Sequence, residues 1–149
     1  MNEQTVLLVD DDTSFLENMK KGLEYSIKNL KMITHTNAED ACKYLTKKHV
    51  SLLITDQNLP GMSGVELVNF VDKNYPRIPI ILITAYGTPK LKNHAINTGA
   101  IKFLRHLLPP PEGWCWLKYC KYWKILICRL TSLTVDLTFT SLWKRLNLP

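Results

Sequence analysis

The stretch Val6–Asp12, VLLVDDD, joins a short apolar run to three consecutive aspartates. Two further runs, Leu52–Thr55 and Ile80–Ile83, are also rich in branched residues, and they are followed by Asp56 and Thr84. Runs of this length and composition are typical of buried parallel strands. Because ligands bind beyond the carboxyl ends of the strands in an open parallel sheet, we expect the polar side chains after these runs to share one pocket.

Strand and helix patterns alternate along the first hundred residues, with short connections between them, which predicts an α/β doubly wound domain. Helical periodicity starts after a capping residue, Asp12 or Thr13, and runs to about Ser26. Further helices are expected to open at Asn37, to end before Pro76, and to begin after Thr88 with Pro89 in the first turn. The expected strands are Thr5–Val9, Lys31–Thr36, Ser51–Thr55, Ile78–Thr84 and Ala100–Arg105.

The chain has 149 residues, which suits one domain with a substantial core and a modest extension. No secretory signal is visible, and no apolar stretch reaches the ~18 residues that a membrane span needs. We therefore expect a cytoplasmic protein with reduced cysteines and no membrane span. Residues 106–149 supply +4 of the net charge of +6. The first part is thus close to neutral. Because nothing in the sequence indicates a DNA-binding helix-turn-helix, we expect no direct contact with nucleic acid.

Adjacent carboxylates at Asp10 and Asp11, with Asp56 nearby, would repel one another unless a divalent cation neutralised them. Oxygen ligands with room for water favour Mg²⁺ over other metals. Asp12 fits better as a helix cap than as a ligand. The histidines His35, His49 and His94 lack metal-binding spacing and are expected at the surface or in a satisfied core position.

Four motifs in order resemble the receiver domain of bacterial two-component response regulators. They cover residues 5–105, and they are Val6–Asp12, Leu53–Gly64, Ile81–Ala85 and Gly99–Leu104. The resemblance implies a flavodoxin-like, five-stranded parallel sheet with strand order 2-1-3-4-5. It also implies a phosphoacceptor signalling domain that is no enzyme beyond its own phosphorylation and dephosphorylation.

By the same resemblance, Asp56 is the nucleophile that takes a phosphoryl group from a histidine kinase or phosphotransfer protein. Mg²⁺ would be bound by Asp10, Asp11, Asp56 and the backbone carbonyl of Asn58. The Thr84 hydroxyl would hydrogen-bond a phosphoryl oxygen. Phe103 stands at the position of the family's aromatic switch, whose rotamer is coupled to phosphorylation.

The chain departs from the family after Arg105. The family has lysine and then proline where this chain has His106 and Leu107, so a mostly neutral ring replaces a charged donor. All four tryptophans, three of the four cysteines and a run of three prolines lie in residues 106–149, an atypical hydrophobic and basic extension that replaces the usual last helix. Two interpretations stay open: a reading-frame change near codon 106, or a native extension with an amphipathic helix over Trp114–Leu130.

Three functional hypotheses follow. The first is a single-domain receiver, residues 1–105, that is phosphorylated at Asp56 and regulates a downstream protein partner. The second is a pseudo-receiver that binds partners without phosphorylation, which His106 and the extension over residues 106–149 favour. The third is a phosphohydrolase of the haloacid dehalogenase type, because Asp10-x-Asp12 resembles the opening motif of that family. Asp10 would then be the nucleophile, and the loop after Asp56 would have no explanation.

Overall fold

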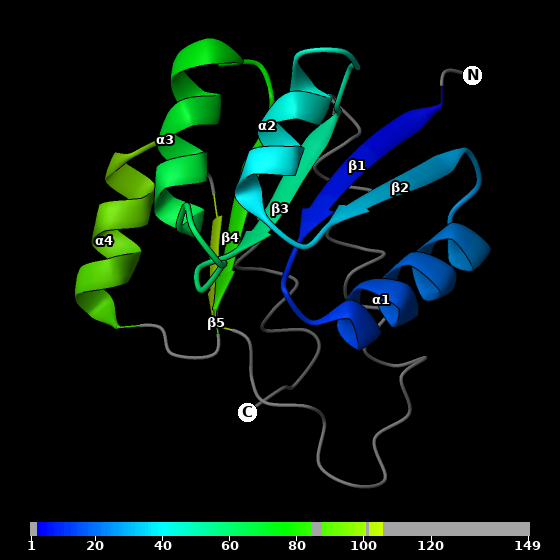
Figure 1. Ribbon diagram of the computed structural model, residues 1–149, viewed down its shortest axis with the longest axis horizontal. Helices are drawn as coiled ribbons and strands as arrows, with labels where there is room; N and C mark the ends of the chain where they lie inside the picture. The colour runs from blue at the N-terminus through cyan, green and yellow to red at the C-terminus, as the bar shows by residue number, and fades with distance from the viewer. Residues whose placement is uncertain (1–2, 85–87, 101, 106–149) are drawn as a thin grey trace, which may run out of the picture.

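A computed structural model of the chain describes residues 3–84, 88–100 and 102–105. Strands and helices alternate strictly along this part of the chain (Figure 1). The strands are β1 (Gln4–Val9), β2 (Leu30–His35), β3 (Leu52–Asp56), β4 (Ile80–Thr84) and β5 (Lys102–Arg105). The helices are α1 (Thr13–Ser26), α2 (Ala38–Leu45), α3 (Gly64–Asn74) and α4 (Pro89–Asn97). The predicted alternation of elements is therefore confirmed.

The five strands form one parallel sheet in the order β2-β1-β3-β4-β5. This is the flavodoxin-like order that the resemblance implied. The order reverses direction between β1 and β3, because β2 lies on one side of β1 and the later strands on the other. Each pair of consecutive parallel strands is joined by a crossover connection that contains a helix. In sheets of this kind a ligand site is expected where the strand order reverses direction, here between β1 and β3.

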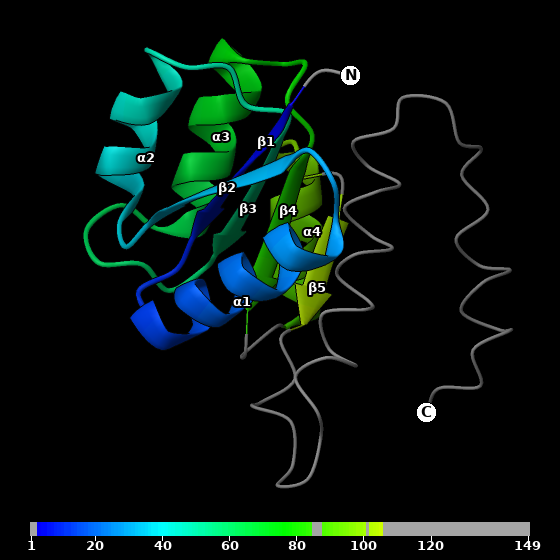
Figure 2. The ribbon, with the colours of Figure 1, turned by 90° about the vertical axis from the view of Figure 1, so that its right-hand side faces the viewer.

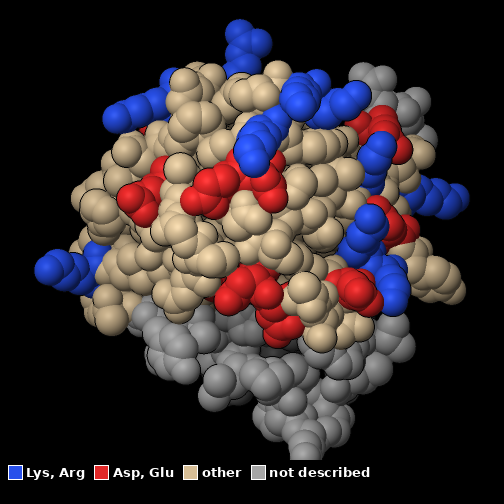
Figure 3. All heavy atoms as spheres, viewed as in Figure 1, with Lys and Arg blue, Asp and Glu red and all other residues tan. Residues whose placement is uncertain are grey.

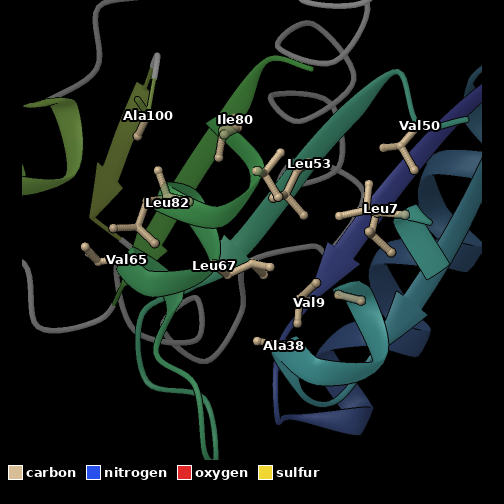
Figure 4. Packing of buried hydrophobic residues seen from close by; sticks show 14 of the residues in the cluster. Leu7, Val9, Ala38, Val50, Leu53, Val65, Leu67, Ile80, Leu82 and Ala100 are labelled. Carbon is tan, nitrogen blue, oxygen red and sulfur yellow. The ribbon is translucent and has the colours of Figure 1, made fainter. Parts of the chain in front are cut away.

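Helices cover both faces of the sheet: α1 lies on one face, and α2, α3 and α4 lie on the other (Figures 1 and 2). Successive residues of each strand point to opposite faces of the sheet. Val6 and Leu8 therefore pack in the hydrophobic cluster on the α1 side, and Leu7 and Val9 pack in the cluster on the other side. Figure 4 shows the second cluster, in which strand residues such as Leu53 meet Leu67 of α3. Strands buried on both faces explain why the strand sequences are continuously apolar.

Each described helix begins after a polar side chain that accepts a hydrogen bond from a backbone N–H of its first turn. The capping residues are Asp12, Asn37, Ser63 and Thr88. Pro89 occupies the first turn of α4, where its missing N–H costs nothing. These caps explain why the helix starts predicted for α1, α2 and α4 agree with the observed ones. No start was predicted for α3.

The predicted strand bounds were wrong by one or two residues, most clearly at β4. The strand was expected from Ile78 but begins at Ile80. Ile78 instead closes a turn by donating its N–H to the carbonyl of Tyr75, at 2.9 Å. Pro79 has no N–H to give to a neighbouring strand, although its carbonyl accepts from Leu53. The apolar run is thus longer than the strand.

Strand β2 forms one edge of the sheet, and a side chain of α1 covers part of that edge. The Met32 N–H donates to Oε1 of Glu24 at 2.8 Å. Met32 itself is buried beneath α1. The Glu24 carboxylate therefore already accepts a hydrogen bond from a backbone N–H in the middle of the edge strand β2.

Candidate functional site

The register of the sheet brings the predicted site residues to the same edge. Val9 pairs with Thr55, so Asp10 and Asp56 follow at the ends of the neighbouring strands β1 and β3. Asp56 in turn pairs with Ile83, which places Thr84 one residue further along on β4. Asp10 and Thr84 are 46 and 28 positions from Asp56 in the sequence, and the strand pairing makes both of them its neighbours.

Asp10 is a buried carboxylate, with only 8% of its surface exposed. Its Oδ1 accepts the N–H of Asp12 at 2.9 Å, and its own N–H donates to the carbonyl of His35. Burial raises the pKa of Asp10 to about 7, and the nearby charges of Asp56 and Asp11 push it in the same direction. Ionisation of Asp10 beside these carboxylates is therefore disfavoured unless a cation is present.

We expect this burial to appear in the stability of the metal-free protein. The pKa of Asp10 lies higher in the folded chain than its ordinary value of 3.8, so stability is lost as pH rises toward about 7. Asp10→Asn keeps an oxygen for the Asp12 N–H and removes the charge. In EDTA at about pH 8 it should raise the free energy of unfolding by about 2 kcal/mol.

The measurement is urea unfolding of parent and variant at several pH values, with and without Mg²⁺. The difference in free energy of unfolding between Asp10→Asn and the parent should shrink toward about pH 5, where the parent carboxyl in the folded protein is protonated and therefore uncharged like the Asn amide. Saturating Mg²⁺ should stabilise the parent more than the variant. Parallel pH profiles for the two proteins would contradict this account of Asp10.

Asp56 is half-buried, and its orientation is fixed by the loop that follows it. The Asn58 N–H donates to Oδ2 of Asp56 at 2.6 Å. The Gln57 N–H donates to the carbonyl of Ile83 at 3.0 Å, which holds the start of the loop against β4. Thr84 at the end of β4 is only 1% exposed. The half-buried carboxylate thus lies at this edge of the sheet, with a buried hydroxyl residue on the next strand.

The other two aspartates of the first motif have different environments. Asp11 is exposed, whereas Asp12 uses Oδ1 to accept the Phe15 N–H at 3.0 Å. Asp12 is thus the N-cap of α1, as the sequence predicted. Figure 3 shows acidic side chains gathered at the lower border of the described surface, the side toward which the strand arrows of Figure 1 point.

The side-chain atoms at this edge that could coordinate a metal are oxygens, which suits Mg²⁺. Within the described residues, no three Asp, Glu, His or Cys side chains converge into a ready-made metal cage. Mg²⁺ does not require one, since it commonly keeps several waters and binds through one or two carboxylates. The raised pKa of Asp10 and its repulsion by Asp56 and Asp11 are the observations that fit a cation here.

The family comparison agrees with this arrangement: residues 6–110 match the family model described as the response regulator receiver domain. This chain belongs to the response regulator receiver domain family. Receiver domains are signalling domains and not catalytic enzymes. The match runs five residues past the boundary predicted at Arg105, and the proposed division at residue 105 stays a prediction.

Curated relatives of the receiver domain are longer regulators. Response regulator protein PilR of Pseudomonas aeruginosa is 32% identical over 106 residues, which are 70% of this chain and 23% of PilR. Response regulator protein FleR of the same organism is 34% identical over 99 residues, 66% of this chain and 20% of FleR. The chain therefore spans about a fifth to a quarter of the length of these relatives.

Solved receiver domains share the fold. The signal receiver domain of a putative LuxO repressor protein from Vibrio parahaemolyticus superposes with a TM-score of 0.73, at 21% identity and covering 99% of both chains. A CheY-like receiver domain protein from Methanospirillum hungatei gives 0.67 at 22% identity, covering 85% of this chain and 95% of that one.

The two predicted switch residues, Phe103 and His106, have side chains outside the described part of the structure. The backbone of Phe103 lies in β5 opposite Leu82, but its side chain is outside the described part of the structure. His106 lies outside the described residues, as does the helix predicted over Trp114–Leu130.

No helix in the described part of the chain is long and apolar enough to cross a membrane.

Sequence reasoning missed several residues that shape the receiver site. Gln57 accepts the Val65 N–H with Oε1 at 3.2 Å, and its carbonyl accepts the Gly64 N–H. Ser63 and Glu66 form a reciprocal capping box at the start of α3. The spacing Ser-x-x-Glu before an apolar run could have revealed the capping box. Nothing in the sequence marks Gln57, because its partner depends on the path of the loop.

His35 differs from its expected role as a surface or satisfied residue. It is half-buried, and its Nε2 is buried without a hydrogen-bond partner among the described residues. Burial lowers the pKa of His35, which favours the neutral ring. Its ring lies against Tyr44 at a centroid distance of 5.7 Å. His49 and His94 are exposed, as predicted.

Proposed function

We propose that this receiver domain accepts a phosphoryl group on Asp56 from a histidine kinase or phosphotransfer protein and so acts in phosphorelay signalling. The observation that carries the proposal is the register of β1, β3 and β4. It sets Asp56 beside the buried Asp10 and one residue from Thr84 on the next strand. The family membership supports it independently.

The transfer requires little covalent chemistry from the protein. A carboxylate oxygen of Asp56 attacks the phosphorus in line with the bond to the leaving group. The new O–P bond forms as the old bond breaks, and the leaving group keeps the bonding electron pair. The Asn58 N–H, bound to Oδ2 of Asp56, holds the carboxylate in one orientation for this attack.

Asp10, Asp11, Asp56 and the Asn58 carbonyl are the groups that would hold Mg²⁺. When bound, the ion would offset the negative charge on the phosphoryl oxygens. The bound ion would favour the ionised form of the buried Asp10, whose pKa is raised to about 7 without a metal. The Thr84 hydroxyl would donate to a phosphoryl oxygen, and the state of Phe103 would report the modification.

The proposed partners are a histidine kinase or phosphotransfer protein upstream and a protein partner downstream. The proposed location is the cytoplasm, where such kinases present their phosphohistidines. The relatives PilR and FleR are longer response regulators, so action as a single domain belongs to the proposal.

Incubation with acetyl phosphate and Mg²⁺, followed by borohydride reduction and peptide mass spectrometry, tests the proposal. We expect one modified residue, Asp56. Modification of Asp10 would favour the phosphohydrolase, although Asp12, whose Oδ1 caps α1, would then need a second role. Absence of any modification, with acetyl phosphate and with a mixture of histidine kinases, would favour the pseudo-receiver that His106 suggests.

A further inference from the structure

We propose that Glu39 is a positioning residue for the metal site, because its carboxylate anchors the tip of the loop that carries Asn58. The inference rests on the proposed function, since it concerns the same site. Glu39 lies in the first turn of α2, on a different element from every residue that the sequence assigned to the site. It is a carboxylate that the transfer chemistry itself does not use.

The anchoring contact is a hydrogen bond from the Met62 N–H to Oε1 of Glu39, at 3.0 Å. It connects residues 23 positions apart, and it crosses from α2 to the loop between β3 and α3. Gly61 beside it has φ +77°, and a Cβ there would press on the Glu39 carboxylate. The backbone thus turns tightly beneath the carboxylate, in a conformation that favours glycine.

The loop, residues 57–63, is fixed at both ends by other bonds. At its base, the Gly64 N–H donates to the carbonyl of Gln57 at 3.0 Å. At its start, the Asn58 N–H donates to Asp56. Between these points the chain projects outward with Pro60 and Gly61 exposed. The bond from Glu39 holds this projecting part, four residues after Asn58, so it limits where the Asn58 carbonyl can point.

Helix α2 gives Glu39 a rigid base. Asn37 caps the helix by accepting the Asp40 N–H at 2.8 Å, and Asp40 is paired with Lys43 at 2.9 Å. Ala38 and Ala41 are fully buried against the sheet. The carboxylate therefore starts from a fixed backbone.

A surface carboxylate could also make this contact without any effect on the site. Variants of the full chain separate the two cases. Glu39→Ala removes the acceptor and the charge, whereas Glu39→Gln removes the charge and keeps an acceptor oxygen. Glu17→Ala is the matched control, because Glu17 is an exposed carboxylate on α1 whose nearest partner is Lys21, at 3.4 Å.

Isothermal titration calorimetry would give the affinity for Mg²⁺, and hydrogen exchange would report the Met62 amide. We expect Glu39→Ala to weaken Mg²⁺ binding about fivefold and to speed exchange at Met62 by a similar factor. Glu39→Gln should stay within about twofold of the parent, and Glu17→Ala should be unchanged. Equal losses in Glu39→Ala and Glu39→Gln would overturn the proposal, because charge rather than the bond would then be responsible.

Phosphorylation of Asp56 by acetyl phosphate, measured in the same variants, separates this inference from the proposed function. If the parent is phosphorylated and Glu39→Ala binds Mg²⁺ as the parent does, the inference fails and the function stands. If the parent is not phosphorylated but only Glu39→Ala loses Mg²⁺ affinity, the function fails and the inference stands. A parent chain that binds no Mg²⁺ overturns both.

Discussion

Asp56→Asn should abolish phosphorylation by acetyl phosphate and Mg²⁺. An amide oxygen carries no formal charge and is a far weaker nucleophile than a carboxylate, so no O–P bond should form at this position. The amide still offers an oxygen to the Asn58 N–H, so the loop should keep its path. Intact-protein mass spectrometry measures the result directly, as the presence or absence of one added phosphoryl group.

Two further variants make the test specific. Asp56→Glu retains the carboxylate but displaces it by one methylene, and we expect a loss of roughly a hundredfold in rate because attack depends on position. Asp12→Asn removes a neighbouring exposed charge while preserving the cap of α1, and it should be labelled like the parent. Labelling that survives in Asp56→Asn and vanishes in Asp10→Asn would refute the assignment of Asp56.

Gly64→Ala should be among the most destabilising single changes in the described part of the chain. A Cβ at this position would collide with the backbone carbonyl of Asp56 and would lie 2.8 Å from Cδ1 of Leu82. The carbonyl belongs to the central strand β3, so it cannot move away without disturbing the sheet. We expect a loss of about 3 kcal/mol in the free energy of unfolding, and a melting temperature lower by roughly 10–20 °C.

A double variant distinguishes the two collisions. Leu82→Ala removes the side chain near Gly64 but leaves the Asp56 carbonyl in place. If the backbone contact dominates, Leu82→Ala should not rescue Gly64→Ala, and the two losses should add or worsen. Thermal unfolding followed by circular dichroism is sufficient for the comparison. Recovery of stability in the double variant would show that the contact with Leu82, and not the contact with the Asp56 carbonyl, causes most of the destabilisation.

The elements that the sequence predicted best are those whose ends are set by local chemistry. Helix α1 was expected over Thr13–Ser26 and lies there, because Asp12 caps it and its apolar residues recur with helical spacing. The gathering of Asp10, Asp56 and Thr84 also followed from the sequence, since parallel strands end at a common edge. The roles assigned to these residues stay predictions until the site is labelled.

What the sequence did not reveal depends on how segments meet. The start of β4 was misplaced because apolarity continues through Ile78, which the chain uses in a turn. Glu39 was overlooked because its contact with Met62 exists only once α2 lies beside the loop. The closeness of Gly64 to the Asp56 carbonyl likewise arises from packing α3 on β3 and not from any local pattern.

The contact between Glu24 and Met32 bears on how copies of this domain can associate. An outermost strand with open backbone groups invites another chain to extend the sheet, which is a common route to aggregation. Here a helix carboxylate already holds the N–H of Met32, so an incoming strand would have to displace a charged group before pairing. Glu24→Ala would open that position. Pairing of another strand with this border is thereby disfavoured at Met32, in the middle of β2.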